Sequence, residues 1–258
     1  MSGTVQIIDL NSDLGESFGA LRIGYDDALF PLISSANVAC GFHGGDPRTL
    51  ERTVAACLAH GVGIGAHPGF PDLVGFGRRV IAATPDEVRT DTLYQLGALD
   101  AFCRAAGARL QHVKPHGALS NVTMKDEALA GAIAAAIKAY NPELILFAMP
   151  GSALLAAGEA AGLRIAREAF ADRAYNGDGS LVNRRLPGAM ITDPDEAAAR
   201  MVRLVTEGTL PTIDGQELAL QADTICTHSD TPGAVEIVQA VRRGLEAAGV
   251  VVRAPAAG

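Results

Sequence analysis

The sequence predicts an α/β protein built on a mostly parallel sheet. Short apolar runs alternate with longer helical segments about seven times along the 258 residues. The runs are continuous rather than alternating in polarity, as expected of strands that are buried on both faces. Regular alternation of strand and helix produces parallel strands. On this pattern alone the sheet either closes into a barrel or stays open and doubly wound.

The predicted strands are seven apolar runs, at residues 5–9, 36–39, 62–66, 110–113, 144–148, 163–166 and 223–227. A polar segment follows almost every run, as at the loop side of an α/β sheet. The chain contains no proline- or serine-rich linker. We therefore expect a single domain over residues 1–258, with residues 254–258 as a small, mobile tail.

Helix starts are predicted from capping residues. Aspartate or threonine followed by proline marks a helix N-terminus, and it occurs at residues 46–47, 84–85, 193–194 and 231–232. Alanine-rich helices are expected over residues 128–140 and 152–161. Helix ends are expected where a left-handed residue is needed, near Gly61, Gly107, Gly162 and Gly249.

Composition excludes several classes of function. The net charge is −8, from 21 basic and 29 acidic residues. Binding to nucleic acid or to an anionic membrane needs a basic face, so we expect neither partner. No apolar run is long enough to span a bilayer, and the N-terminus lacks a signal-peptide pattern, so we expect a cytoplasmic protein. The four cysteines form no CxxC pair and are expected to be free thiols.

Polar side chains gather directly after the predicted strands. They include Asn11, Asp13, Glu16, His43, Asp46, His67, Arg78, Arg79, Lys114, His116, His228 and Asp230. The carboxyl ends of parallel strands meet on one face of a barrel or at one edge of an open sheet. We therefore expect these groups to converge on one site. Asp46 is equally well explained as an N-cap, and Arg78 and Arg79 as solvated surface.

These residue types indicate acid–base chemistry. Carboxylates beside histidines serve as general acids and bases, and a lysine stabilises developing negative charge. The predicted catalytic residues are Asp13, Glu16, His43, His67, Lys114 and His116. Asp13, His43, His67 and His116 are also candidate ligands for zinc, manganese or iron. The sequence contains no GxSxG motif, which disfavours a serine nucleophile, and no GxxxxGK[ST] motif, which disfavours a Walker-type ATPase. It also lacks the HExxH zinc motif, so the residues leave open whether a metal is bound.

Seven motifs, in order, resemble those of the LamB/YcsF family. They are DLNSDLGE (9–16), ANVACGFHGGDP (36–47), GAHPGFPD (65–72), GFGRR (75–79), VKPHGAL (113–119), REAFADRAY (167–175) and HSDTPGA (228–234). The departures from the family pattern fall at Gly44, Gly69, Phe70, Ser120 and Ser229. They exchange neighbours of the charged groups and leave the charged groups in place.

The resemblance implies an irregular seven-stranded (β/α) barrel of the glycoside hydrolase/deacetylase type. It implies ATP-dependent hydrolysis of 5-oxo-L-proline (pyroglutamate) to L-glutamate, together with 5-oxoprolinase subunits B and C. Because this chain has no nucleotide motif, ATP and its Mg²⁺ are expected to act largely at the partner subunits. A homo-oligomer of this chain is also compatible with the sequence.

Roles for individual residues follow as hypotheses. Asp13 or His116 is expected to act as base for water, while Lys114 and His67 stabilise oxygen charge. Arg78 or Arg79 is expected to hold the substrate carboxylate. The full predicted substrate-binding set is Asn11, Asp46, Arg78, Arg79, His228 and Asp230.

Two other functions fit the same residues. One is a metal-dependent amide hydrolase such as a carbohydrate deacetylase, with Asp13, His43, His67 and His116 as ligands and no need for ATP. The other is a non-catalytic subunit that binds a lactam or a sugar. Stoichiometric metal in the purified protein favours the first, and site substitutions that alter binding alone favour the second.

Overall fold

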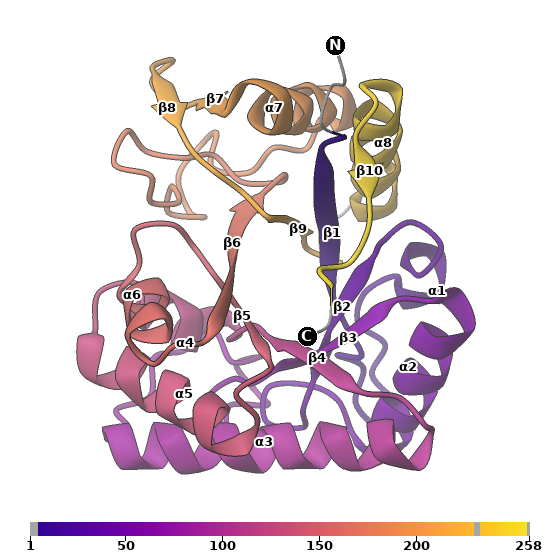
Figure 1. The fold of residues 1–258 in the computed structure, drawn as a ribbon, viewed down its shortest axis with the longest axis vertical. Coiled ribbons are helices and arrows are strands. Elements are labelled where there is room, and N and C mark those ends of the chain that lie inside the picture. The colour runs from indigo at the N-terminus through magenta and orange to yellow at the C-terminus, as the bar shows by residue number, and fades with distance from the viewer. Residues whose placement is uncertain (1–4, 230–232, 257–258) are drawn as a thin grey trace.

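Seven parallel strands form a closed barrel (Figure 1). The structure, a computed structural model, describes residues 5–229 and 233–256. The barrel strands, in order of pairing, are β1 (Ile7–Leu14), β2 (Ser35–Ala39), β3 (Gly63–His67), β4 (Leu110–Val113), β5 (Ile145–Ala148), β6 (Arg164–Phe170) and β9 (Thr224–Thr227). Strand β9 pairs back onto β1 and closes the ring. The prediction of an irregular seven-stranded (β/α) barrel is confirmed, and the open doubly wound sheet is excluded.

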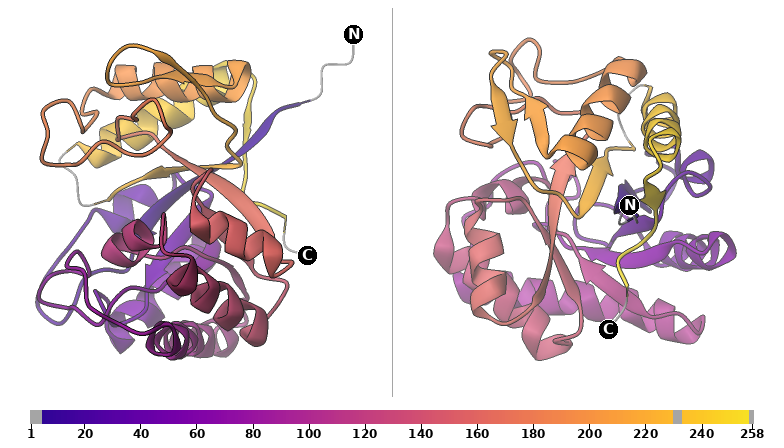
Figure 2. Two further views of the ribbon diagram at one scale, coloured as in Figure 1. Left: turned by 90° about the vertical axis from the view of Figure 1, so that its left-hand side faces the viewer. Right: turned by 45° about the horizontal axis from the view of Figure 1, so that its top comes forward.

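Helices surround the barrel (Figures 1 and 2). The long ones are α2 (Pro47–His60), α3 (Pro85–Ala105), α5 (Glu127–Tyr140), α6 (Ala153–Ala160), α7 (Pro194–Glu207) and α8 (Ala234–Ala247); the short ones are α1 (Asp26–Leu29) and α4 (Gly117–Val122). Figure 2 shows α7 and α8 packed side by side, on the opposite side of the barrel from α3 and α5. Apolar faces of these helices and the outer faces of the strands form one large core.

The predicted caps account for the helix boundaries. Asp46 accepts a hydrogen bond from the backbone N–H of Thr49, and Thr84 with Glu87 forms a capping box. The four glycines predicted at helix ends all have positive φ, between 67° and 79°. The predicted start of the last helix, Thr231-Pro232, lies outside the described residues, and α8 follows Gly233.

Strands β1 and β6 run further than predicted. The prediction ended them at Asp9 and Ala166, whereas they extend to Leu14 and Phe170. The prediction treated the polar residues there as loop. It was wrong because their side chains satisfy one another inside the barrel: the Asn11 amide donates to Thr224 Oγ1 at 2.7 Å and to Glu168 Oε1 at 3.2 Å. A polar run does not end a strand when its hydrogen bonds are met in the interior.

Three short strands were not predicted. β7 (Thr209–Pro211) and β8 (Glu217–Ala219) form an antiparallel hairpin between α7 and β9. β10 (Val251–Val252) pairs in parallel with the start of β1. Beyond β10, the carbonyl oxygens of Pro255 and Ala256 accept hydrogen bonds from Gln111 and Arg164. The single domain and the mobile tail stay predictions.

One close contact inside the barrel depends on a glycine. The His112 ring is fully buried, stacks on Phe147 with 4.1 Å between ring centroids, and donates to Asn37 Oδ1 at 2.9 Å. A Cβ atom on Gly65 would lie 2.0 Å from His112 Nε2. Only glycine on β3 therefore leaves room for this histidine.

All four cysteines are buried free thiols, as predicted. Among residues 5–229 and 233–256, no helix is both long and apolar enough to cross a membrane.

Candidate active site

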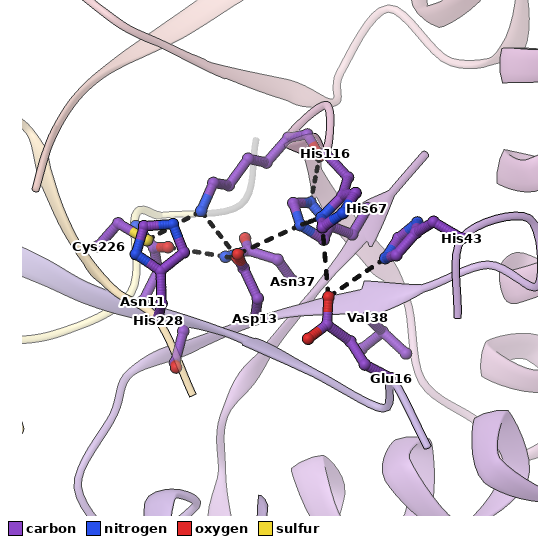
Figure 3. A network of polar contacts seen from close by, with 12 residues as sticks. Asn11, Asp13, Glu16, Asn37, Val38, His43, His67, His116, Cys226 and His228 are labelled. Carbon is purple, nitrogen blue, oxygen red and sulfur yellow. Dashed lines mark hydrogen bonds and ion pairs between the residues drawn. The ribbon is translucent and has the colours of Figure 1, made fainter. Parts of the chain in front are cut away.

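The deepest part of the site is a buried ion pair between β1 and β4. Asp13 Oδ1 accepts hydrogen bonds from Lys114 Nζ at 2.8 Å and from the Asn37 amide at 2.9 Å (Figure 3). Lys114 Nζ also lies 3.2 Å from Glu168 Oε1 and 2.9 Å from Cys226 Sγ. One ammonium group thus joins β1, β6 and β9 at the centre of the barrel.

Charge pairing fixes the protonation states of this group. Burial raises the pKa of Asp13, but His67 and Lys114 outweigh it and hold that pKa well below its usual value. Burial lowers the pKa of Lys114, but Asp13, Cys226 and Glu168 outweigh it and raise that pKa well above the usual value. Burial raises the pKa of Cys226, so its sulfur stays a thiol. Asp13 is therefore a carboxylate and Lys114 an ammonium at neutral pH.

Three histidines from three strand ends meet beside the ion pair. His43 follows β2, His67 ends β3, and His116 caps α4 after β4. The His43 and His116 rings stack with centroids 3.7 Å apart, and His67 meets His116 edge-on at 4.8 Å. Glu16 Oε1 lies 3.2 Å from His43 Nε2 and 3.7 Å from His116 Nδ1 (Figure 3). Burial lowers the pKa of both His43 and His116, so these rings are neutral near pH 7.

Backbone carbonyls fix the tautomers of His67 and His116. His67 Nδ1 is 2.6 Å from the carbonyl oxygen of Lys114, and His116 Nε2 is 2.8 Å from that of Phe76. A carbonyl oxygen only accepts, so each of these ring nitrogens carries the proton. The opposite nitrogens, His67 Nε2 and His116 Nδ1, lie within hydrogen-bonding distance of each other at 3.0 Å. Asp13 Oδ2 lies 3.3 Å from His67 Nε2.

A cavity of about 420 Å³ opens above these groups. Its polar lining includes Asp13, His67, Lys114, His116, Arg78, His228 and three arginines of the β6–α7 connection, Arg173, Arg184 and Arg185. His228 Nδ1 donates to Asp172 Oδ2 at 2.7 Å, and His228 Nε2 accepts from Arg184 at 2.8 Å. Phe170 and Met149 supply apolar surface. The cavity therefore offers acid–base groups at its base and cationic groups around them.

The structure brings most of the predicted site residues together. Asp13, Glu16, His43, His67, Lys114 and His116 form one buried cluster, and Asn11 lies beneath it in β1. Arg78 and His228 line the cavity. Asp46 and Arg79 do not: Asp46 caps α2 and also accepts from the backbone N–H of Gly19, while Arg79 is paired with Asp72 and largely exposed. Asp230 lies outside the described residues.

Several residues of the site were not predicted. Asn37 and Cys226 lie within strands, where an apolar run concealed them, and Glu168 lies in the part of β6 beyond its predicted end. The motif at residues 167–175 contains Asp172 and Arg173, and that motif was the available signal. Arg184 and Arg185 lie in an irregular connection far from any predicted strand, so no local pattern marks them.

A closed parallel barrel with carboxylates, histidines and a lysine buried at the carboxyl ends of its strands defines a class of barrel enzymes. The sequence model of the LamB/YcsF family matches residues 8–257, and the chain belongs to this family.

Similar proteins cover the whole chain. The A subunit of 5-oxoprolinase from Symbiobacterium thermophilum is 54% identical over 255 residues, which are 99% of this chain and 98% of that protein. The protein of the same name from Thermus thermophilus is 54% identical over 247 residues, 96% of this chain and 99% of that one. The crystal structure of a lactam utilization protein, also from Thermus thermophilus, superposes with a TM-score of 0.94 at 53% identity, covering 97% of this chain and 100% of that one.

Proposed function

We propose that this chain is the A subunit of an ATP-dependent 5-oxoprolinase, which hydrolyses 5-oxo-L-proline to L-glutamate. The observation that carries the proposal is 54% identity over essentially the full length to relatives that bear the name of this 5-oxoprolinase component. The buried acid–base cluster supports it independently, because opening an amide ring needs proton transfer and stabilisation of an oxyanion.

The ATP chemistry belongs in this proposal to partner subunits B and C, with Mg²⁺ bound there. A five-membered lactam is a stable amide, so its hydrolysis needs coupling to ATP. The sequence lacks a P-loop motif, and the cavity groups suit hydrolysis rather than nucleotide binding. Four buried free thiols suit the reducing cytoplasm, where we place the complex.

Roles follow from the protonation states. Lys114, held as an ammonium, stabilises the oxygen of the activated amide, and Asp13 keeps it charged and in place. Neutral His116 presents Nδ1 as the proton acceptor for water, and its ring is held by the hydrogen bond from Nε2 to the carbonyl oxygen of Phe76 at 2.8 Å. Arg78 holds the substrate carboxylate in preference to Arg79, because Arg78 lines the cavity and Arg79 does not.

The direct test is glutamate release from 5-oxo-L-proline with this chain alone, and then with subunits B and C and ATP. We expect glutamate only when all subunits and ATP are present. No glutamate from the complete, folded system would refute the proposal.

One observation favours a second candidate, metal-dependent amide hydrolysis. His67 Nε2 and His116 Nδ1 lie 3.0 Å apart, with Asp13 Oδ2 3.3 Å from His67 Nε2, and once deprotonated these are donors of the kind that a divalent transition metal ion takes. Glu16 and His43 also lie within ligand reach of the two histidines. A bound ion would supply Lewis-acid chemistry at the base of the cavity.

Elemental analysis of the purified chain tests this candidate. Stoichiometric zinc, manganese or iron, lost in a His67→Ala variant, would support the metal site. Deacetylation of N-acetyl sugars without ATP, abolished by a chelator, would support the second function over the first. Absence of bound metal after purification in the presence of each ion would refute the metal site.

A further inference from the structure

A further histidine–carboxylate pair lines the cavity, apart from the cluster around Glu16. His228 Nδ1 donates to Asp172 Oδ2 at 2.7 Å. The other oxygen of this carboxylate, Asp172 Oδ1, is buried and has no hydrogen-bond partner among the described residues. Asp172 is 1% exposed, whereas His228 reaches the cavity. The carboxylate is therefore in place to orient this histidine and to fix which of its ring nitrogens carries the proton.

The surroundings of His228 hold its ring in one orientation and one tautomer. The ring stacks on Phe170, with the centroids 5.6 Å apart and the planes at 17°. Burial raises the pKa of Asp172, but His228 and two nearby arginines outweigh it and hold that pKa below its usual value, so Asp172 is a carboxylate. A carboxylate only accepts hydrogen bonds, so Nδ1 carries the proton and Nε2 is the nitrogen left for proton exchange.

His228 faces the centre of the site from the side opposite to the other histidines of the cavity. In Figure 3 it lies on one side of Asp13, and His67 and His116 lie on the other. One ring nitrogen of His228 is within 4.8 Å of a carboxylate oxygen of Asp13, and His67 Nε2 is 3.3 Å from Asp13 Oδ2. A substrate whose oxygen is held by Lys114, beside Asp13, therefore has histidine on both sides.

Opening a lactam ring needs a proton donor as well as a base. The base takes a proton from water. The ring nitrogen does not leave as an anion, so it must gain a proton as the carbon–nitrogen bond breaks. His116 as the base and Lys114 at the oxygen leave the second of these proton transfers without a donor.

We propose that His228 donates its Nε2 proton to the ring nitrogen of the lactam, and that Asp172 positions it for this step. This inference rests on the proposed function. Water adds to the ring carbon as hydroxide while its other proton goes to His116 Nδ1. The electron pair of the carbon–nitrogen bond moves onto nitrogen, which takes the proton from His228 and becomes the free amine. His116 is left protonated and His228 neutral, and one proton passed through solvent restores both.

Arg184 opposes the protonation that this step requires. In the structure Arg184 Nη2 donates to His228 Nε2 at 2.8 Å, so this nitrogen presents a lone pair. The nitrogen takes up a proton only when the guanidinium turns away, and Arg184 lies on an exposed stretch of the β6–α7 connection that leaves it room to do so. Asp172 favours the protonated ring through its negative charge, and Arg184 disfavours it. The other charged or titratable groups around the ring are Asp13 on β1, Lys114 after β4, Cys226 on β9 and Arg173 beside Asp172.

The pH profile of glutamate release tests the pair, with subunits B and C in excess so that this chain limits the rate. A proton donor must be protonated, so its contribution is lost at high pH. Asp172→Asn removes the charge that favours the protonated ring, so kcat should fall at least about tenfold and its decline should start at lower pH. Arg184→Ala removes the opposing charge and should move the decline to higher pH. His228→Gln should lower kcat about 10²-fold or more with little change in KM.

Asp178→Asn is the matched control, because it removes the same charge from an exposed position in the same connection. It should leave kcat and the pH profile unchanged. A loss in Asp172→Asn that is equal at every pH would make Asp172 a structural residue and overturn the inference. So would a wild-type kcat in His228→Gln.

NMR of the chain alone separates this inference from the proposed function. The nitrogen shifts of the His228 ring report which nitrogen carries the proton. We expect the proton on Nδ1 in the wild type and a mixture of tautomers in Asp172→Asn. The same tautomer in both proteins would refute the positioning role of Asp172. No glutamate from the wild-type complex would instead reject the proposed function, and the lactam nitrogen as proton acceptor with it, whatever the NMR result.

Discussion

The Asp13–Lys114 pair sets the electrostatics of the cavity at the scale of single residues. Both groups are buried, so each depends on the other for its charge. Glu168 is the second carboxylate near the ammonium, and burial raises its pKa although Lys114 opposes the shift. Asp13 is therefore the partner that keeps Lys114 charged and pointed at the substrate.

Replacing Asp13 by Asn should abolish most of the turnover while the fold is kept. We expect glutamate formation to fall by about 10²–10³-fold, the usual cost of losing one oxyanion-stabilising group, because Lys114 loses the carboxylate that keeps it charged and in place. Loss of one partner of a buried pair should lower the free energy of unfolding by about 3 kcal/mol. Steady-state kinetics and urea unfolding measure both.

Asp27→Asn is the matched control, because it removes the same charge from an exposed position on α1. It should change neither quantity. Near-normal turnover in Asp13→Asn would remove Asp13 from the mechanism.

At the scale of elements, the sequence predicted strands and helices well where their signals are local. Capping residues and apolar runs located α2, α3, α7 and most of the barrel. The second half of β1 was missed because its polar side chains pair with Asn37, Thr224 and Lys114, which are distant in sequence. Asp13 and His67 were found as candidates because they lie in polar segments after predicted strands, whereas Asn37 lies inside a predicted strand.

Element packing yields a prediction on β3. Gly65→Ala should lower the free energy of unfolding by about 2 kcal/mol or more, because its methyl group would overlap the buried His112 ring. Gly97→Ala in α3 should instead raise stability by about 0.5–1 kcal/mol, since nothing described lies within 4 Å of the added Cβ and alanine favours the helix. Denaturant unfolding of both variants compares them. A neutral Gly65→Ala would mean that His112 adopts another position.

At the scale of the whole molecule, buried histidine couples stability to pH. Burial lowers the pKa of His112 from 6.5 to about 3, with smaller contributions from Lys114 and His67. Between about pH 6.5 and about pH 3, the His112 side chain is therefore protonated in the unfolded chain and neutral in the folded chain. Its contribution to stability is present above pH 6.5 and is lost as the pH falls toward 3.

Unfolding measured at two pH values checks this sign. When the pH falls from about 7 to about 5, the effect of His112 should lower the free energy of unfolding by about 2 kcal/mol. His112→Gln, which keeps a donor for Asn37, should show a shallower pH dependence than the wild type even if it is less stable throughout. Parallel pH profiles for the two proteins would contradict the assignment, and His43 and His116 would then account for acid sensitivity.

The pairing of β1 with both β9 and β10 has a consequence for how the chain acquires its structure during synthesis. The first strand finds its last neighbours only among residues 224–252, so the ring cannot close until almost all of the chain has left the ribosome. Contacts between such distant segments make folding slow, because the intervening chain must be ordered first. Until then β1 and β6 each expose an unpaired edge that can recruit other nascent chains. Production of this protein should therefore depend on chaperones and on temperature more than its folded stability alone suggests.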